Sequence, residues 1–407
     1  MKRISVAMLT IASFFSYAAD SNQSLIEKGK YLAEMGDCYA CHTIDGGEPY
    51  AGGAPFATPF GTVYSTNITP DKKEGIGRYS YQDFYDALHN GDAPGGQLYP
   101  AMPYTSYAGI TSDDTKALFA YFQSIKPSAQ KNKDNDMIFP TNIRFGMKFW
   151  NMLNLKKGEF TPTPGKSAQW NRGNYIVNTF GHCGECHTPR NSTMGMDLER
   201  HFRGAMIGEV YAPNITPQLL KDRGWGTTDV EAMLAHGYSR KGTVVGEMYT
   251  AIFHSLSKFN TDDLRAATIY LLDSDNTIQG KTLTYHTKGL GSKGHELYQA
   301  YCANCHGYEG EGKPNYAPGM QGNGTLAQRN HYNTAHAIMY GIKPQYYSQT
   351  NAFFTMPAFN ARLSDEDLMH LLNYLTQAYT NNPKQLSLSE VQSLRKKVEE
   401  SQSNATH

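Results

Sequence analysis

Three pentapeptides of the form Cys-x-x-Cys-His account for all six cysteines of this chain of 407 residues. Their spacing is the attachment signature of c-type haem, because two thiols three positions apart can each add to one haem vinyl group. The histidine that follows then lies under the ring as the proximal iron ligand. We therefore predict three covalent haem c groups, with His42, His187 and His306 bound to iron. The cysteine pairs are Cys38 and Cys41, Cys183 and Cys186, and Cys302 and Cys305.

Other uses of paired cysteines fit this sequence less well. Zinc sites of this kind bring two Cys-x-x-Cys pairs, or one pair and two histidines, together in one small unit. Here the pairs lie more than one hundred residues apart, and each carries the same trailing histidine. A disulfide framework would not require that histidine three times, and a thioredoxin-like redox site would require only one pair.

The N-terminus is predicted to direct export. Two basic residues at positions 2 and 3 precede an apolar run from Ile4 to Tyr17, and small residues follow at Ala18 and Ala19. This pattern indicates a secretory signal peptide, residues 1–19, and the run is short for a membrane span. An uncleaved anchor is the alternative. Export agrees with covalent haem attachment, which bacteria carry out outside the cytoplasmic membrane, so we expect the protein on its periplasmic side.

The charge of the chain is balanced, with 37 basic and 37 acidic residues. Removal of the signal peptide takes away basic residues and haem propionates add negative charge, so we expect a mildly anionic holoprotein. Nucleic-acid binding needs a basic surface patch, for which the sequence gives no sign. The length fits two to four domains of about 100–200 residues each.

A threefold internal repeat surrounds the haem motifs. Each repeat begins with an amphipathic helix that carries a glycine, Gly29, Gly173 or Gly294, and leads into the haem motif. A middle helix follows and ends at a glycine that we expect to be a left-handed C-cap. The middle helices are Tyr81–His89 before Gly91, Thr228–His236 before Gly237, and Asn333–Tyr340 before Gly341.

Each repeat closes with another amphipathic helix. Its start has the pattern of a capping box, and a tyrosine lies seven residues beyond the acidic member. We expect the first helix to cross this last helix, with the glycine allowing close approach and the tyrosine packing at the crossing. The sets are Thr111, Asp114 and Tyr121, then Asn260, Asp263 and Tyr270, then Ser364, Asp367 and Tyr374.

These repeats predict a mainly α fold of three tandem class I cytochrome c domains, each a small helical fold around one covalent haem. Three generic helix bundles would leave the coincidence of haem motif, cap and tyrosine unexplained. The predicted segments are residues 1–19 (signal peptide), 20–127 (domain one), 128–166 (linker with an amphipathic helix), 167–275 (domain two), 276–383 (domain three) and 384–407 (polar tail).

A methionine between the middle and last helices of each repeat is the candidate for the sixth iron ligand. The three are Met102, Met248 and Met356, and proline follows the first and the third. Methionine closes the iron site and raises its potential, which suits electron transfer. Because Met248 lacks the proline, Met206 is its competitor. Three further histidines are alternative iron ligands, although most of them are expected at the surface or at a haem edge: His182, His254 and His336.

Repeats one and two share a loop that repeat three lacks. Asn67-Ile68-Thr69-Pro70 returns as Asn214-Ile215-Thr216-Pro217, and each is followed by a glycine-rich turn. We expect this loop to wrap one haem edge, with an ordinary Thr-Pro turn as the alternative. Repeat three has a glycine-rich loop over residues 307–323 instead, so its haem is expected to differ in edge exposure and potential.

Several segments are more specific than the haem motifs themselves. They are the two Asn-Ile-Thr-Pro loops, Leu98-Tyr99-Pro100-Ala101-Met102-Pro103-Tyr104, Phe139-Pro140-Thr141-Asn142-Ile143-Arg144, Trp170-Asn171-Arg172-Gly173, and Cys186-His187-Thr188-Pro189-Arg190. In these segments, and over nearly the whole chain after the signal peptide, the sequence resembles the triheme cytochrome c subunits of bacterial membrane-bound dehydrogenases. Those dehydrogenases act on alcohols, gluconate, sorbitol and related compounds.

The resemblance implies an electron relay with no substrate chemistry of its own. The expected partner is a large flavin- or PQQ-dependent dehydrogenase subunit, and a small third subunit is a further candidate. Electrons would pass singly through the haems to ubiquinone at the periplasmic face of the cytoplasmic membrane. The implied iron ligand pairs are His42 with Met102, His187 with Met248, and His306 with Met356.

Two other functions stay open on the sequence alone. A peroxidase-like multihaem enzyme would need an iron without methionine, and the three matched methionines speak against it. The haem subunit of a terminal oxidase would normally show a membrane helix, and none follows the predicted signal peptide.

Two amphipathic segments outside the repeats have open roles. The tail over residues 383–407 is polar with a weak apolar face, and we favour a frayed helix over a dehydrogenase-docking element or a weak interfacial anchor. The stretch from Phe145 to Leu155 is the better candidate for contact with a membrane or a partner. For it we favour a helix buried between domains one and two.

Overall fold

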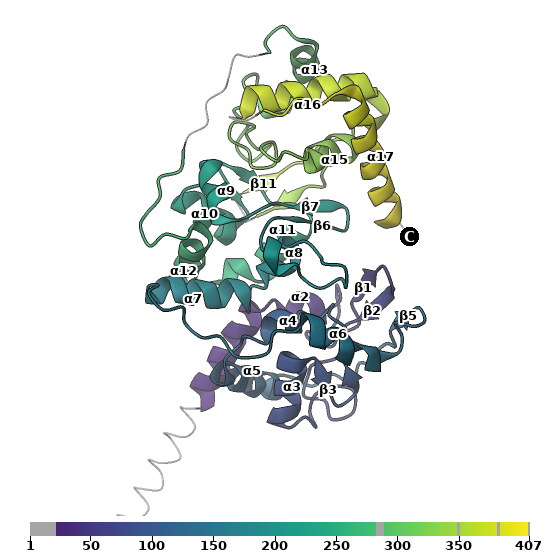
Figure 1. Cartoon of the computed structure of the whole chain (residues 1–407), viewed down its shortest axis with the longest axis vertical. Coiled ribbons are helices and arrows are strands. Elements are labelled where there is room, and N and C mark those ends of the chain that lie inside the picture. Colours follow the sequence, from purple (N-terminus) through teal and green to yellow (C-terminus); the bar gives the residue numbers. More distant parts are fainter. Residues whose placement is uncertain (1–21, 282–288, 348–350, 381–382, 406–407) are drawn as a thin grey trace, which may run out of the picture. The chain divides into compact units, whose positions relative to one another are not determined.

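The computed structural model describes residues 22–281, 289–347, 351–380 and 383–405, and this part of the chain is largely helical (Figure 1). The predicted signal peptide lies outside the described residues. The chain forms two compact units. Unit 1 runs to Pro164 and includes Tyr175–His182, whereas unit 2 comprises Gly165–Asn174 and Cys183–His407. The predicted boundary between domains two and three falls inside unit 2 and stays a prediction.

Unit 1 combines short helices with a small sheet. It begins with a helix over residues 22–35. Strands β1, β2 and β5 form an antiparallel sheet in that order, and β3 pairs with β4 in a short hairpin. The elements are α2 (Cys38–His42), β1 (Pro55–Thr58), β2 (Gly61–Tyr64), α3 (Tyr81–Asn90), β3 (Asp92–Ala93), β4 (Gly96–Gln97), α4 (Tyr104–Tyr107), α5 (Ser112–Ser124), β5 (Asp136–Met137), η1 (Arg144–Gly146) and α6 (Met147–Asn154).

Unit 2 shows a similar order of elements twice, with two-stranded hairpins and no larger sheet among its described residues. Its first half comprises α7 (Ala168–Asn178, shared with unit 1), α8 (Cys183–His187), η2 (Leu198–Arg200), β6 (Ala205–Ile207), β7 (Val210–Ala212), α9 (Pro217–Asp222), α10 (Thr227–His236), β8 (Tyr238–Ser239), β9 (Gly242–Thr243), α11 (Glu247–His254), η3 (Leu256–Lys258) and α12 (Thr261–Leu272). Its second half comprises α13 (Lys293–Tyr301), α14 (Ala303–His306), α15 (Tyr332–Tyr340), β10 (Gln345–Tyr346), β11 (Ala352–Phe353), η4 (Asn360–Arg362), α16 (Asp365–Tyr379) and α17 (Leu388–Ala405).

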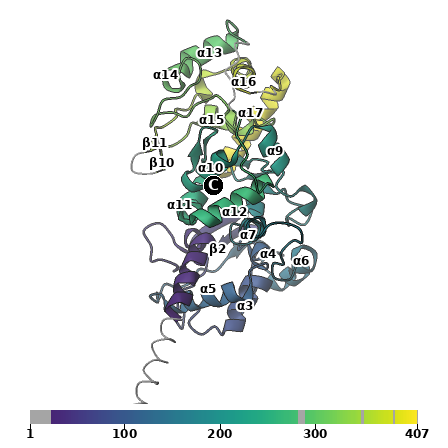
Figure 2. The same cartoon turned by 90° about the vertical axis from the view of Figure 1, so that its left-hand side faces the viewer.

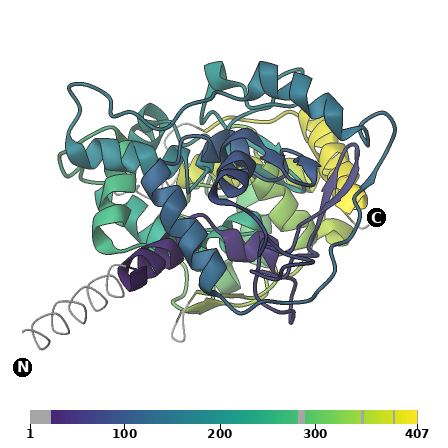
Figure 3. The same cartoon turned by 90° about the horizontal axis from the view of Figure 1, so that it is seen from below.

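The predicted helix crossing is present in the first repeat. There the N-terminal helix crosses α5 with Gly29 at the contact (Figure 3). A Cβ atom built on Gly29 would lie 1.9 Å from the carbonyl oxygen of Ala117 and 2.8 Å from the Cβ of Tyr121. Neither distance is compatible with van der Waals contact, so any larger residue would push the two helices apart.

The other two repeats cross in nearly the same way. In Figure 2, α13 and α16 lie side by side, as do the helices of the preceding repeat. The glycine again faces a backbone carbonyl and the predicted tyrosine, so the expected role of all three glycines is confirmed. A built Cβ would meet Ala266 O at 1.9 Å and Tyr270 Cβ at 2.8 Å from Gly173, and His370 O at 2.1 Å and Tyr374 Cβ at 2.6 Å from Gly294.

The predicted N-caps of the last helices are confirmed. The side chains of Thr111, Asn260 and Ser364 accept hydrogen bonds from backbone N–H groups three residues later, at 3.3, 2.8 and 3.1 Å. Each bond satisfies a donor that has no partner within the helix. The sequence therefore placed the start of α5, α12 and α16 correctly.

The glycine C-caps of the middle helices are confirmed in two repeats and not in the third. Gly91 (φ 62°, ψ 26°) and Gly237 (φ 75°, ψ 2°) adopt the left-handed helical conformation. Gly341 has φ 75° but ψ −174°, so the prediction of a left-handed cap was wrong there. The chain instead leaves α15 extended, because Ile342 exchanges two backbone hydrogen bonds with Met356 (3.0 and 2.9 Å).

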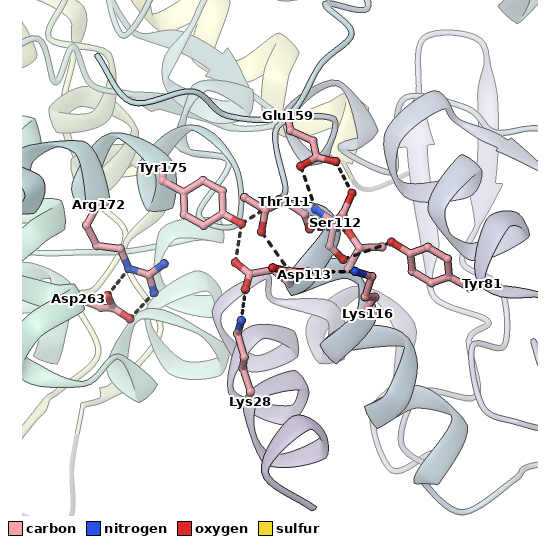
Figure 4. Close-up of polar contacts among 12 residues, drawn as sticks. Lys28, Tyr81, Thr111, Ser112, Asp113, Lys116, Glu159, Arg172, Tyr175 and Asp263 are labelled. Atoms are coloured by element: carbon pink, nitrogen blue, oxygen red, sulfur yellow. Dashed lines mark hydrogen bonds and ion pairs between the residues drawn. The ribbon is translucent and has the colours of Figure 1, made fainter. Parts of the chain in front are cut away.

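An ion pair that the sequence analysis missed joins the first and last helices in repeats one and two (Figure 4). In each case the residue before the crossing glycine binds the acidic residue of the last helix. Lys28 Nζ lies 2.6 Å from Asp114 Oδ1, and Arg172 binds Asp263 through Nε (2.6 Å) and Nη2 (2.8 Å). Both carboxylates are largely buried, so these pairs fix the crossing more firmly than surface ion pairs would.

The C-terminal tail is a packed helix, so the favoured prediction of a frayed helix was wrong. Helix α17 contributes Val391, Leu394 and Val398 to the same apolar core as α13, α15 and α16. Val391 and Val398 are fully buried. The weak apolar face seen in the sequence is therefore an internal packing face.

The favoured prediction for the linker helix was also wrong. Phe149, Met152 and Leu153 of α6 are 62%, 81% and 73% exposed, and no residue of this helix is buried. Within the described ranges, no helix combines the length and the apolar composition that crossing a bilayer requires.

Candidate haem-binding site

The haem motifs form short helices that follow the first helix of each repeat. Helices α2 and α8 each contain a complete motif, and α14 begins directly after Cys302. A helical turn places two cysteines three positions apart on neighbouring parts of one face. No disulfide joins any of the six cysteines, so each sulfur is available for the thioether bond that haem attachment requires.

The histidine of each motif is oriented by a backbone carbonyl. His42 Nδ1 bonds to the carbonyl oxygen of Thr66 at 2.6 Å, His187 Nδ1 to that of Pro213 at 2.7 Å, and His306 Nδ1 to that of Pro318 at 2.8 Å. A carbonyl oxygen can only accept, so Nδ1 carries the proton and Nε2 keeps its lone pair. This arrangement fixes the tautomer and the ring orientation that an iron ligand needs.

Burial also favours the neutral form of these histidines. It lowers the pKa of His42, His187 and His306, because desolvation disfavours the imidazolium form. A neutral imidazole is the form that binds iron. The thiol pairs and the oriented histidines therefore fit covalent haem c.

The shared Asn-Ile-Thr-Pro loop has a defined role that the sequence analysis did not find. The Asn67 side chain accepts from the backbone N–H (2.9 Å) and the hydroxyl (2.7 Å) of Thr69, and Asn214 does the same with Thr216 at the same distances. This turn holds the preceding residue, Thr66 or Pro213, whose carbonyl binds the haem-motif histidine. Thr66 and Pro213 each directly precede the asparagine of their loop, and this shared position was the feature of the sequence that could have predicted the contact.

The third repeat obtains the same contact from a different loop. Pro318 lies in the glycine-rich loop, which returns to the haem motif through a hydrogen bond from Gly312 N–H to His306 O (2.7 Å). Gly312 has φ 79°, and a Cβ there would lie 2.5 Å from Gly319 N. Glycine is therefore required for the loop to fold closely enough to present the Pro318 carbonyl.

The three candidate methionines lie in three different local structures, and all are half-buried. Met102 lies in a turn, with its N–H bonded to Tyr99 O (3.1 Å) and its carbonyl accepting from Tyr104 N–H (2.8 Å). Met248 lies in the first turn of α11, and Met356 is held by its backbone pairing with Ile342. The competitor Met206 lies in β6 and is 47% exposed. Iron ligation by these methionines stays a prediction.

The other candidate histidines have surroundings of their own. His182 packs edge-on against Tyr107, with ring centroids 5.8 Å apart. His254 lies beside Phe253, and His336 lies 3.8 Å from a carboxylate oxygen of Glu209.

A short helix with two cysteines placed for haem attachment and a histidine held for metal binding is the defining site of a c-type cytochrome. The cytochrome c family model matches residues 26–126 and 291–378, which contain the first and third haem motifs. This protein therefore carries covalent haem c and transfers electrons.

Three relatives narrow the family further. The gluconate 2-dehydrogenase cytochrome c subunit of Pantoea cypripedii is 36% identical, over 97% of this chain and 95% of that protein. The cytochrome c subunit of the quinone alcohol dehydrogenase of Gluconobacter oxydans is 34% identical, over 96% and 86%. The fructose dehydrogenase cytochrome subunit of Gluconobacter japonicus is 34% identical, over 93% and 84%. The chain belongs to this family of dehydrogenase cytochrome c subunits.

Proposed function

We propose that this protein is a triheme electron-transfer subunit that passes electrons from a flavin- or PQQ-dependent dehydrogenase to ubiquinone. Its three tandem domains, residues 20–127, 167–275 and 276–383, each hold one haem. The predicted iron ligand pairs are His42 with Met102, His187 with Met248, and His306 with Met356. After export, the protein acts at the periplasmic side of the cytoplasmic membrane.

One observation supports three haems per chain. Each haem-motif histidine has an Nδ1 bond to a backbone carbonyl, at 2.6–2.8 Å, and lies in a repeat with the same glycine crossing. A motif without haem would not need this orientation. The threefold occurrence supports three equivalent attachment sites.

The names of the relatives support the proposal that the partner is a dehydrogenase. They are subunits of dehydrogenases for gluconate, alcohol and fructose, so the substrate varies while the cytochrome subunit is shared. A bound haem supplies a one-electron carrier. The chain supplies thioether attachment, histidine orientation and burial of the rings, and the substrate is left to the partner.

Haem analysis of the purified mature protein tests the proposal. We expect three covalent haems per chain by mass and by pyridine haemochrome absorbance, and two in a Cys302→Ala, Cys305→Ala variant. Met102→Ala, Met248→Ala and Met356→Ala should each lower one reduction potential and remove about one third of the methionine–iron absorption. An unchanged spectrum for Met248→Ala would shift that ligand to Met206.

Two results would contradict this function. Substantial binding of carbon monoxide to one haem of the reduced wild-type protein would indicate an open iron and favour a peroxidase-like enzyme. Isolation of the native complex with an oxidase core, in place of a flavin or PQQ dehydrogenase, would make the chain a terminal oxidase subunit.

A further inference from the structure

Seven large apolar side chains gather in a short segment of unit 1. Their exposed fractions run from 53% to 81%. Four of them, at positions 145, 149, 152 and 153, recur with helical spacing and therefore share one face of η1 and α6. We call the seven residues the linker patch: Ile138, Phe139, Ile143, Phe145, Phe149, Met152 and Leu153.

The polar side of α6 faces the protein. The Asn151 side chain accepts from the Tyr104 hydroxyl (2.7 Å) and donates to the carbonyl of Asn90 (3.2 Å). Trp150 packs edge-on against the same tyrosine, with ring centroids 6.4 Å apart. A surface helix of a water-soluble protein normally has the reverse orientation, with its apolar face inward. We therefore expect the outward apolar face of α6 to be covered by a binding partner.

The linker patch is held firmly on unit 1. The Arg144 guanidinium donates to the carbonyls of Gly95 (3.0 Å), Gly96 (3.2 Å) and Gln97 (2.6 Å) in the β3–β4 hairpin. Tyr99 donates its hydroxyl to Thr141 O at 2.8 Å. Figure 1 shows α6 beside α4, the helix that contains Tyr104. These bonds present the patch in a fixed position, so its exposure is built into the fold.

The chain segment that carries the patch has formal charges of one sign between its flanking residues Asp136 and Glu159. Between Asp136 and Glu159 the chain has no acidic residue and four basic ones: Arg144, Lys148, Lys156 and Lys157. Lys156 and Lys157 are exposed, and Lys148 Nζ lies 5.7 Å from the centre of the Phe145 ring. The rest of the sequence carries an excess of acidic residues, since the whole chain has 37 of each sign. The local positive charge is therefore a property of this segment.

We propose that the linker patch inserts into the headgroup region of an anionic phospholipid bilayer; this inference rests on the proposed membrane-side function. Phenylalanine, methionine and leucine on one face, with lysines beside them, is the pattern of helices that lie in the plane of a membrane surface. The basic residues complement anionic headgroups. Helix α17, the other amphipathic segment, already uses its apolar face in the core.

Vesicle flotation of the full-length holoprotein tests this assignment. The probes are vesicles of phosphatidylethanolamine with phosphatidylglycerol, and vesicles of phosphatidylcholine alone. A Phe149→Ser, Met152→Ser variant should bind the first vesicles at least about tenfold more weakly, because two inserted side chains are lost. The matched control is Phe253→Ser, Met194→Ser, which removes residues of the same types from unit 2, 56% and 45% exposed, and should bind like wild type.

The charge contribution is measured separately. Lys156→Gln, Lys157→Gln should weaken binding to phosphatidylglycerol vesicles and leave binding to phosphatidylcholine unchanged, and added salt should have the same effect as the variant. Haem absorbance and far-ultraviolet circular dichroism, equal to wild type, establish that each variant is folded.

Wild-type flotation by the Phe149→Ser, Met152→Ser variant would overturn the membrane assignment. The same conclusion follows if that variant floats normally but no longer binds the dehydrogenase in detergent, since the patch would then be a protein interface. Reduction of the haems by the dehydrogenase in detergent tests the proposed function independently. The Phe149→Ser, Met152→Ser variant should be reduced as fast as the wild-type protein. If the dehydrogenase fails to reduce the wild-type protein, the proposed electron-transfer function is refuted, while the membrane assignment still depends on vesicle flotation alone.

Discussion

Helices α6 and α17 are both amphipathic, but their apolar residues lie in opposite surroundings. Both lie outside the three repeats, and both have an apolar face next to basic residues. In α17 the apolar residues point inward, with Val391 and Val398 fully buried. In α6 they point outward, with Met152 81% exposed. An amphipathic pattern predicts that a helix has two faces, but it does not predict which face meets the protein.

The surface available to each helix decides the orientation. Helix α16 has a broad buried apolar surface, and α17 packs against it as part of the same core. The Asn373 side chain of α16 fixes the approach, since it accepts from Leu386 N–H (2.7 Å) and donates to Leu386 O (2.9 Å). Around α6 the protein instead offers Tyr104 Oη and the Asn90 carbonyl, which need polar partners.

The largest effect is expected from a charge in the buried face of α17. Val398→Asp places a carboxylate at a fully buried position and should weaken the packing of α17 by about 3 kcal/mol or more. Limited proteolysis after residue 383 should then be about 100-fold faster. The control, Met152→Asp in α6, should change the free energy of unfolding by less than about 0.5 kcal/mol. If Val398→Asp and Met152→Asp lower the free energy of unfolding equally, the proposed difference between α17 and α6 is wrong.

The next effect concerns the polar anchor of α17. Arg395 binds Asp365 through Nε (2.5 Å), donates to the carbonyl of Leu363 (2.8 Å) and also bonds to Asn360. Arg395→Ala should destabilise the packing of α17 by about 2 kcal/mol, because these are hydrogen bonds of a charged and mostly buried group. Arg395→Lys should recover part of this loss, since it keeps the charge but not the planar fork. Urea unfolding of the three proteins measures the difference, and a neutral Ala variant would refute the anchor.

A smaller effect is expected from the anchor of α6. Asn151→Ala removes the acceptor of the buried Tyr104 hydroxyl and should cost about 1 kcal/mol, confined to α6 and its neighbours. Amide hydrogen exchange should become faster in residues 147–154 and stay unchanged in α17. The exposed Asn142→Ala in the same linker is the matched control. If exchange in α6 is unaffected, its outward apolar face is not held by Asn151.

Features within one repeat could be predicted from sequence, whereas features set by a second surface could not. Gly29 and Tyr121 identify a helix crossing because glycine spacing and helical periodicity are local properties. The cap at Thr111 is local in the same sense. The carbonyl of Thr66 comes from a loop 24 positions from His42, so its contact depends on how that loop folds. The opposite orientations of α6 and α17 depend in the same way on neighbouring surfaces.

The smallest expected effect is a difference between the two helices in how their stability depends on pH. At the start of α17, Glu390 accepts from the backbone N–H (2.9 Å) and the hydroxyl (3.0 Å) of Ser387, and these bonds lower its pKa from 4.5 to about 2. The folded-state pKa is depressed, so this stabilisation is present above the ordinary pKa and is lost as pH falls from about 5 to about 2. Helix α6 contains no carboxylate and should not respond. Amide chemical shifts of residues 388–391 in the reduced protein should show the first turn of α17 fraying over this range. A Glu390→Gln variant should lose the response, and an identical titration in that variant would show that another group controls the start of the helix.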